Sequence, residues 1–181
     1  LEKRFIKNTR ISYLKDDKGK RTNRKEDILN ITTDFYRTLY TSSETNSNSQ
    51  KALLKNIKKT LSQTHKDLLD SPITLEELEK SVKSLNQEKS PGINGLPAEF
   101  YQMFWPLLKE RYLKFINHAF ENSFPVTINT SVTSLLYKEK GDIESLVYYR
   151  PISLINTDIK ILSKTLTNRL CPMLPLIIDK F

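Results

Sequence analysis

A break rich in proline and glycine, residues 90–95, separates two segments whose apolar residues recur at helical spacing. Before the break, Thr74 and Glu77 form the pattern of a capping box, which predicts the start of a helix. After the break, residues 97–122 predict the longest helix of the chain. A kink or restart is expected at Pro106, because proline removes a backbone donor and its ring clashes with the preceding turn. The middle of the chain is therefore predicted as two helices joined by a tight break.

The segments on either side of this pair predict more helix and little strand. Residues 11–14 indicate a short strand running into a turn, and residues 134–137 and 152–155 are short β-type runs. Further helices are expected behind a capping-box pattern at Asn23 and Glu26 and across residues 50–61. We therefore predict an α+β fold, mainly helical, with a small sheet towards the C-terminal end.

The last predicted helix would be capped by Thr157 or Asp158. The segment after it is apolar, and we expect it to leave hydrophobic surface exposed. These apolar residues are Leu174, Leu176, Ile177 and Ile178.

The charge balance favours a polyanionic partner. The chain has 29 Lys and Arg against 21 Asp and Glu, a net charge of +8, and such an excess steers phosphate-rich molecules to the surface. No apolar run approaches the ~20 residues of a membrane span, so no membrane partner is expected. Cys171 is the only cysteine, which excludes an intrachain disulfide and fits a reducing location, cytoplasmic and nuclear.

Three motifs follow one another in the second half of the chain: Lys89–Tyr101, Leu135–Asp142 and Tyr149–Leu154. Their residues, order and spacing resemble the fingers of reverse transcriptases from non-LTR (long interspersed) retrotransposons. Residues 13–40 resemble the segment that links endonuclease and polymerase in such proteins. The resemblance implies an N-terminal linker or helical extension at 1–70 and partial reverse transcriptase fingers at 71–181, with the palm of the right-hand polymerase fold absent.

The resemblance also implies the chemistry of the complete parent protein. It would be an RNA-directed DNA polymerase that uses an RNA template, a DNA primer, dNTPs and Mg²⁺. In the family, the metal-binding aspartates lie on palm strands that follow the fingers. We therefore expect no catalytic residue, no metal ligand and no cofactor in this chain, which would be inactive alone and would have the rest of the polymerase, its palm, as a partner. The adjacent Asp16 and Asp17 are interpreted as turn residues.

The resemblance assigns the incoming nucleotide to the second and third motifs. Arg150 would contact the triphosphate, with Lys138 or Lys140 across the hairpin turn, because Arg grips phosphate through two donors and Lys acts as a point charge. The alternative is that all three are solvated cations on an exposed hairpin.

A second group of residues is predicted to contact nucleic acid. Small residues in the break can expose backbone N–H groups to a template phosphate, and cations on the last helix can follow a nucleic-acid backbone. The alternatives are a plain loop that begins a helix and a solubilising surface. The predicted residues are Lys89, Ser90, Gly92, Gly95, Lys160, Lys164 and Arg169.

Two other functions stay open on the sequence alone. The chain would act as a stand-alone basic module that binds nucleic acid without chemistry, or it would be the product of a decayed element copy with no function. Whether the reading frame continues into palm motifs distinguishes them from the polymerase.

Overall fold

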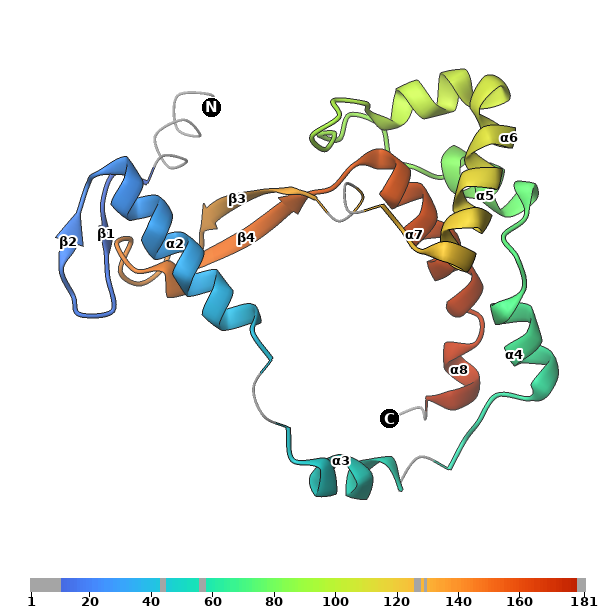
Figure 1. Cartoon of the computed structure of the whole chain (residues 1–181), viewed down its shortest axis with the longest axis horizontal. Helices are drawn as coiled ribbons and strands as arrows, with labels where there is room; N and C mark the ends of the chain where they lie inside the picture. The colour runs from blue at the N-terminus through green and yellow to red at the C-terminus, as the bar shows by residue number, and fades with distance from the viewer. Residues whose placement is uncertain (1–10, 43–44, 56–57, 126–127, 129, 179–181) are drawn as a thin grey trace. The chain divides into compact units, whose positions relative to one another are not determined.

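The computed structural model describes residues 11–42, 45–55, 58–125, 128 and 130–178 (Figure 1). It confirms a mainly helical α+β fold with two small antiparallel sheets. In chain order the elements are β1 (Leu14–Lys15), β2 (Arg21–Thr22), α2 (Lys25–Tyr40), α3 (Ser47–Leu54), α4 (Gln63–Asp70), α5 (Leu75–Lys83), α6 (Ala98–Asn122), β3 (Val132–Tyr137), β4 (Tyr149–Leu154), α7 (Thr157–Leu170) and α8 (Leu174–Ile177).

The chain folds into two compact units, each built from two separate stretches of sequence. The first unit contains the described residues between 11 and 46 together with Thr133–Ser153, and the second contains those between 47 and 132 together with 154–178. This division follows packing, whereas the predicted segments 1–70 and 71–181 follow the family resemblance and stay a prediction.

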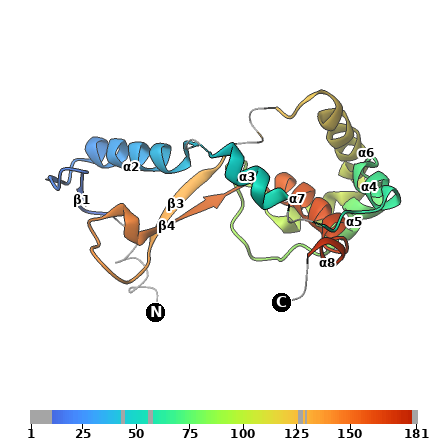
Figure 2. The ribbon, with the colours of Figure 1, turned by 90° about the horizontal axis from the view of Figure 1, so that it is seen from below.

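The first unit packs α2 against the connection between β3 and β4 (Figure 2). Its buried residues are Leu14, Leu146 and Tyr149. Ile28 and Phe35, seven residues apart on α2, pack against them because this spacing places both on one face of the helix. Strands β1 and β2 pair antiparallel beside this core, with Leu14 opposite Thr22.

The register of β3 and β4 fixes which hairpin side chains share a face. The amide of Lys138 donates to the carbonyl of Tyr148 at 2.8 Å, and the hydroxyls of Thr133 and Ser153 lie 3.0 Å apart. From the first pair to the second, the position on β3 falls by five residues and the position on β4 rises by five, as antiparallel pairing requires. Tyr149 points into the core, so Arg150 projects from the opposite face of the hairpin.

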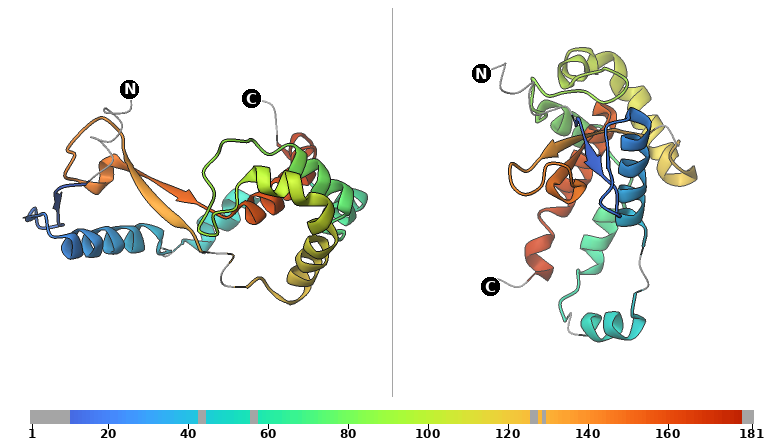
Figure 3. Two further views of the ribbon diagram at one scale, coloured as in Figure 1. Left: turned by 90° about the horizontal axis from the view of Figure 1, so that it is seen from above. Right: turned by 90° about the vertical axis from the view of Figure 1, so that its left-hand side faces the viewer.

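The second unit is a helical core in which α5 packs on both α6 and α7 (Figure 3). Helix α5 contributes Leu78 and Val82, one turn apart on its buried face. Helix α6 contributes Trp105 and Ile116, and α7 contributes Ile161. Each burial removes apolar surface from water, worth about 1.5–3 kcal/mol for a large side chain, so this three-helix contact holds the second unit together.

Of the helix N-caps predicted from local sequence patterns, one is confirmed and two are wrong. The capping box of Thr74 and Glu77 is confirmed. The one expected at Asn23 is wrong, because α2 begins after Arg24 without a side-chain cap. The expected cap of α7 is also wrong, because Asn156 holds that position and the hydroxyl of Thr157 is used elsewhere.

Other boundaries differ from expectation in length. The lysine-rich helix predicted at 50–61 ends at Leu54, and α4 was not predicted. Helix α6 does not restart at Pro106 but continues through it, and its ribbon changes direction along its length (Figure 1). Of the four C-terminal apolar residues expected to be exposed, Leu176 and Ile178 are about half exposed, whereas Leu174 and Ile177 are partly buried. Within the described part of the chain, no helix has both the length and the apolar character needed to cross a bilayer.

Candidate nucleic-acid interface

The loop before α6 is held in shape by its own turn and by the start of α7. The amide of Gly95 donates to the carbonyl of Gly92 at 3.1 Å, and the amide of Leu96 donates to the side-chain carbonyl of Asn94 at 3.1 Å. Across the unit, the amide of Asn94 donates to the side-chain oxygen of Asn156 at 3.2 Å. The predicted loop residues therefore form a closed turn pinned to another helix.

Two further side chains of α7 complete this attachment. The hydroxyl of Thr157, which is 2% exposed, donates to the carbonyl of Leu96 at 2.7 Å. The ammonium of Lys160 donates to the carbonyl of Ser90 at 3.0 Å. Gly92 packs so closely on Asn156 that a Cβ would overlap both its backbone and its side chain. The structure thus brings Ser90, Gly92 and Lys160 together. The sequence had predicted the loop residues and the α7 cation as separate contacts.

Two of the predicted lysines line one shallow pocket. Lys89 and Lys160 share a cavity of about 220 Å³ with Ala98 and Thr157, the first residues of α6 and α7. The N-terminal ends of helices carry partial positive charge. The N-cap residue of neither helix makes a side-chain hydrogen bond to the first N–H groups, although in α7 the amide of Ile159 donates to the carboxylate of Asp158 at 2.8 Å. Two ammonium groups and two helix N-termini make this surface favourable for phosphate, although each helix also carries a carboxylate in its first turn.

The three predicted cations of α7 have different surroundings. Lys160 contacts the loop, Lys164 is exposed on the surface, and Arg169 is buried at 8% exposure. The guanidinium of Arg169 donates to both carboxylate oxygens of Glu77, at 2.5 and 2.7 Å. It also donates to the carbonyl oxygen of Ser71 at 2.5 Å. Arg169 therefore joins α7 to the start of α5, and we leave it out of the proposed nucleic-acid surface.

Electrostatics around this pair follow from the hydrogen bonds. Donation by Arg169 lowers the pKa of Glu77 from 4.5 to about 2, with the Thr74 donors adding to the effect and burial opposing it. The same bonds raise the pKa of Arg169. Sequence reasoning identified Glu77 as a helix cap, and nothing in the spacing indicated that its carboxylate also receives Arg169.

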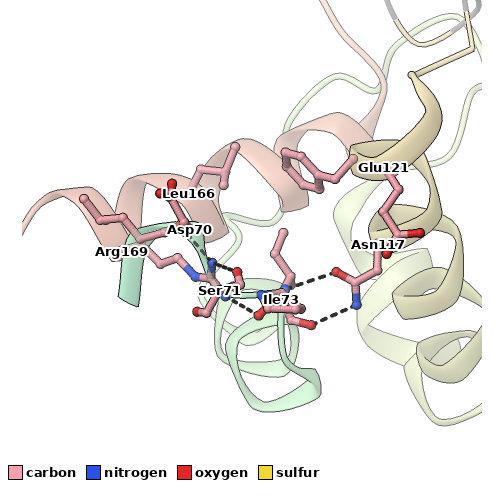
Figure 4. Close-up of a pocket in the computed structure, with 10 residues that line it drawn as sticks. Asp70, Ser71, Ile73, Asn117, Glu121, Leu166 and Arg169 are labelled. Atoms are coloured by element: carbon pink, nitrogen blue, oxygen red, sulfur yellow. Dashed lines mark hydrogen bonds between the residues drawn. The ribbon is translucent and has the colours of Figure 1, made fainter. Parts of the chain in front are cut away.

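A larger cavity, of about 460 Å³, lies beside this ion pair, between the 69–73 segment, α6 and α7 (Figure 4). Asn117 holds Ile73 from the opposite wall, accepting from its amide and donating to its carbonyl, both at 3.1 Å. The carboxylates of Asp70 and Glu121 line the cavity. They make this side of the second unit unfavourable for phosphate.

In the first unit, the β3–β4 hairpin presents the cations predicted to meet a nucleotide. Arg150 is exposed and, among the residues that the structure describes, has no ion pair or side-chain hydrogen bond. The ammonium of Lys138 donates to the carbonyl of Val147 at 2.8 Å, which ties it across the loop. Lys140 is exposed in the turn.

Two acidic residues of the same loop, Asp142 and Glu144, are neutralised by β1 and β2. Lys15 pairs with Asp142 at 2.8 Å, and Arg21 pairs with Glu144 at 2.6 Å. The hydrogen bond from Lys15 lowers the pKa of Asp142, and the reciprocal bond raises the pKa of Lys15. The sequence did not identify Lys15 or Arg21, because their partners lie more than 120 residues away. Among the described residues, the hairpin charges outside these ion pairs are Arg150 on β4 and Lys138, Glu139 and Lys140 in the turn after β3, a net positive set.

Metal-binding groups do not gather in the described ranges: no three His, Cys, Asp or Glu side chains come close enough to hold an ion. The described residues instead form a mainly helical α+β protein that presents cations on a glycine-bearing loop in one unit and on a hairpin in the other. Each of these two groups of cations, taken by itself, has the charge that attracts phosphate.

In sequence, the chain is similar to a transposon protein. It is 32% identical over 171 residues to the uncharacterized 149 kDa protein of transposon TX1 from Xenopus laevis. The similarity covers 94% of this chain and 13% of that relative, so the chain spans a small part of the relative's length. No protein-family model matches the chain. The comparison relates this sequence to transposon-encoded proteins.

Proposed function

We propose that the chain is part of the RNA-directed DNA polymerase of a non-LTR retrotransposon. In this proposal it supplies contacts to template and dNTP phosphates, and the catalytic aspartates belong to sequence outside residues 1–181. The observation that carries the proposal is the transposon similarity along nearly the whole chain, joined to the motif resemblance. Template RNA, primer DNA and the palm would be the partners of the complete polymerase, with Mg²⁺ and dNTPs as its cofactor and substrates.

The loop before α6 is proposed as the template contact. Lys89 and Lys160 share its pocket, and Lys164 continues the cationic surface along α7. Because Asn156 and Thr157 fix the loop backbone, its position is set before a ligand arrives, which reduces the entropy lost on binding.

The hairpin is proposed as the nucleotide contact. Arg150 presents a guanidinium without a partner among the described residues, and a guanidinium can donate two parallel hydrogen bonds to one phosphate. Lys138 is held across the loop, and Lys140 lies in the turn as a more exposed point charge.

The template proposal is tested by measuring RNA affinity as a function of salt. Binding of the 181-residue chain to a single-stranded RNA, followed by fluorescence anisotropy between about 50 and 200 mM salt, is expected to give a log–log slope of about −0.7 per neutralised phosphate. Lys89→Ala and Lys160→Ala should each make that slope less steep, that is, less negative by about 0.7, because each removes one phosphate contact. Lys66→Ala is the control, because Lys66 is exposed on α4 away from the loop. Equal effects of all three substitutions would contradict the assignment.

The nucleotide proposal is tested in the complete polymerase. Arg150→Ala should raise KM for dNTP or lower kcat in primer extension while RNA affinity stays unchanged, and Arg111→Ala on α6 serves as the control. A loss of template affinity instead would show that Arg150 has another role. Sequencing the transcript downstream of the Phe181 codon distinguishes the alternatives: an in-frame stop would leave a stand-alone nucleic-acid-binding module or a decayed copy.

A further inference from the structure

A third cavity, of about 520 Å³, lies within the first unit between α2 and the hairpin. Its size is within the range of about 300–1,000 Å³ typical of small-molecule sites. None of the residues predicted to bind nucleotide or nucleic acid lines it. Its lining residues from α2 and just beyond are Thr32, Thr33, Tyr36, Arg37, Tyr40 and Thr41, and those from the hairpin are Thr133, Leu135 and Ser153.

One polar group of a residue that lines this cavity has no hydrogen-bond partner among the described residues. The Tyr36 hydroxyl is buried and makes no hydrogen bond, although a buried polar atom without a partner is rare and costs about 1–3 kcal/mol. Neighbouring hydroxyls are satisfied: Thr32 donates to the carbonyl of Ile28 at 2.7 Å, and Thr133 and Ser153 bond each other at 3.0 Å. Burial raises the pKa of Tyr36, and because the hydroxyl has almost no accessible surface, Tyr36 offers a ligand its ring and not its hydroxyl.

An exposed aromatic surface adjoins this hydroxyl. Tyr40 stacks on Tyr36 with ring centroids 5.9 Å apart and an angle of 24° between the planes. Tyr40 is nevertheless 70% exposed, so most of its ring faces solvent. An exposed ring of this kind can stack on a planar ligand, and base–aromatic stacking is a general means of holding single strands.

A cation completes the rim of the cavity. Arg37 lines the cavity and pairs with Asp34 at 2.6 Å, with both side chains 69% exposed. Exposed ion pairs of this kind contribute only about 0–1 kcal/mol. A phosphate could therefore replace Asp34 as the partner of Arg37 at little cost.

We propose that this cavity binds a nucleobase of single-stranded RNA, with Tyr40 as the stacking surface and the Tyr36 ring, which stacks on Tyr40, as its support. The flanking phosphate would lie at Arg37. The inference rests on the proposed function, because it requires RNA as a ligand. It concerns a different contact: here a base binds in the first unit, whereas the template contact proposed above is made by RNA phosphates at the second unit.

The experiment separates the two contacts through their salt dependence. Stacking is nearly independent of salt, whereas phosphate contacts set the slope of affinity against salt. Binding of a short RNA that contains one 2-aminopurine is measured by anisotropy and by 2-aminopurine quenching. Tyr40→Ala is expected to weaken binding by about 5- to 150-fold at every salt concentration, with unchanged slope and lost quenching.

Two conservative variants and one control make the test specific. Tyr40→Phe should bind like the wild type because the ring is kept, and Tyr36→Phe should do the same because the buried hydroxyl does not contact the base. Tyr13→Ala removes a partly exposed tyrosine of the same unit that stacks under Arg21 and should leave the quenching unchanged.

The possible failures are distinguishable. If Tyr40→Ala binds like the wild type while Lys160→Ala is weakened, the base pocket is wrong and the proposed template contact stands. If the wild type shows no salt-dependent RNA binding, both proposals are wrong. Circular dichroism of each variant verifies folding, which substitution of the largely exposed Tyr40 should not disturb.

Discussion

Arg169 is the residue on which the second unit depends most at the level of single side chains. It is buried, and its guanidinium holds the Glu77 carboxylate and the backbone carbonyls of Ser71 and Pro72. Arg169→Leu should lower the free energy of unfolding by about 3–5 kcal/mol. It removes the cation paired with a partly buried carboxylate, which keeps only its Thr74 donors, and it removes the guanidinium donors to the carbonyls of Ser71 and Pro72. Urea denaturation measures the change. Lys164→Ala, an exposed position on the same helix, should cost less than about 0.5 kcal/mol.

The lowered pKa of Glu77 makes the stability of this unit dependent on pH. In the folded protein this pKa is about 2, below its ordinary 4.5, so the stabilisation is fully present above about 4.5 and is lost as the pH falls towards 2. The difference in unfolding free energy between wild type and Glu77→Gln should shrink across that window. A difference that stays constant from pH 6 to about pH 2.5 would show that the carboxylate charge of Glu77 contributes nothing.

At the scale of secondary-structure elements, the contacts that attach the 90–96 loop to the start of α7 contribute to the stability of the second unit. At Gly92 a Cβ would overlap Asn156, whereas at Gly95 it would meet nothing but would sit at a φ of +70°. We expect Gly92→Ala to destabilise by about 1–3 kcal/mol through overpacking and Gly95→Ala by about 1–2 kcal/mol through backbone strain alone. Gly92→Ala should additionally speed hydrogen exchange at the Asn94 amide, which donates to Asn156. Unchanged exchange there would mean that the loop is not held by α7.

At the scale of the whole molecule, the two units have cores of different size. Among the described residues, the cluster of the first unit buries three hydrophobic side chains and that of the second buries eight, so the described part of the first unit has less apolar burial to oppose the entropy of its chain. We expect hydrogen-exchange protection in α2 to be lost at a lower urea concentration than in α5. Trp105, the only tryptophan and part of the second core, gives an independent fluorescence signal for that unit. A single transition shared by both signals would contradict separate unfolding.

Local patterns in the sequence predicted much of the secondary structure. The capping box at Thr74, the two helices around the 90–95 break and the paired β-type runs were all readable, because they depend on neighbours within a few residues. The failed cap at Thr157 shows the limit of such patterns. Its hydroxyl bonds Leu96, which lies 61 residues away in sequence.

The candidate site was only partly readable, for the same reason. The motifs named the loop, the hairpin and the cations on α7, but burial placed Arg169 against Glu77, 92 residues away in sequence, and left Arg150 exposed. No short motif marked the Tyr36 cavity, which exists only because α2 packs beside a hairpin about 100 residues later.

The sequence by itself indicated most of the helices and both strands of the hairpin, though not α4; it also determined the net positive charge and showed motifs that resemble those of retrotransposon polymerases. The tertiary structure alone decided which cations are free, which carboxylates are neutralised and where cavities form. The physical reason is that periodicity and capping are short-range properties of the chain, whereas burial and ion pairing depend on which distant segments come into contact.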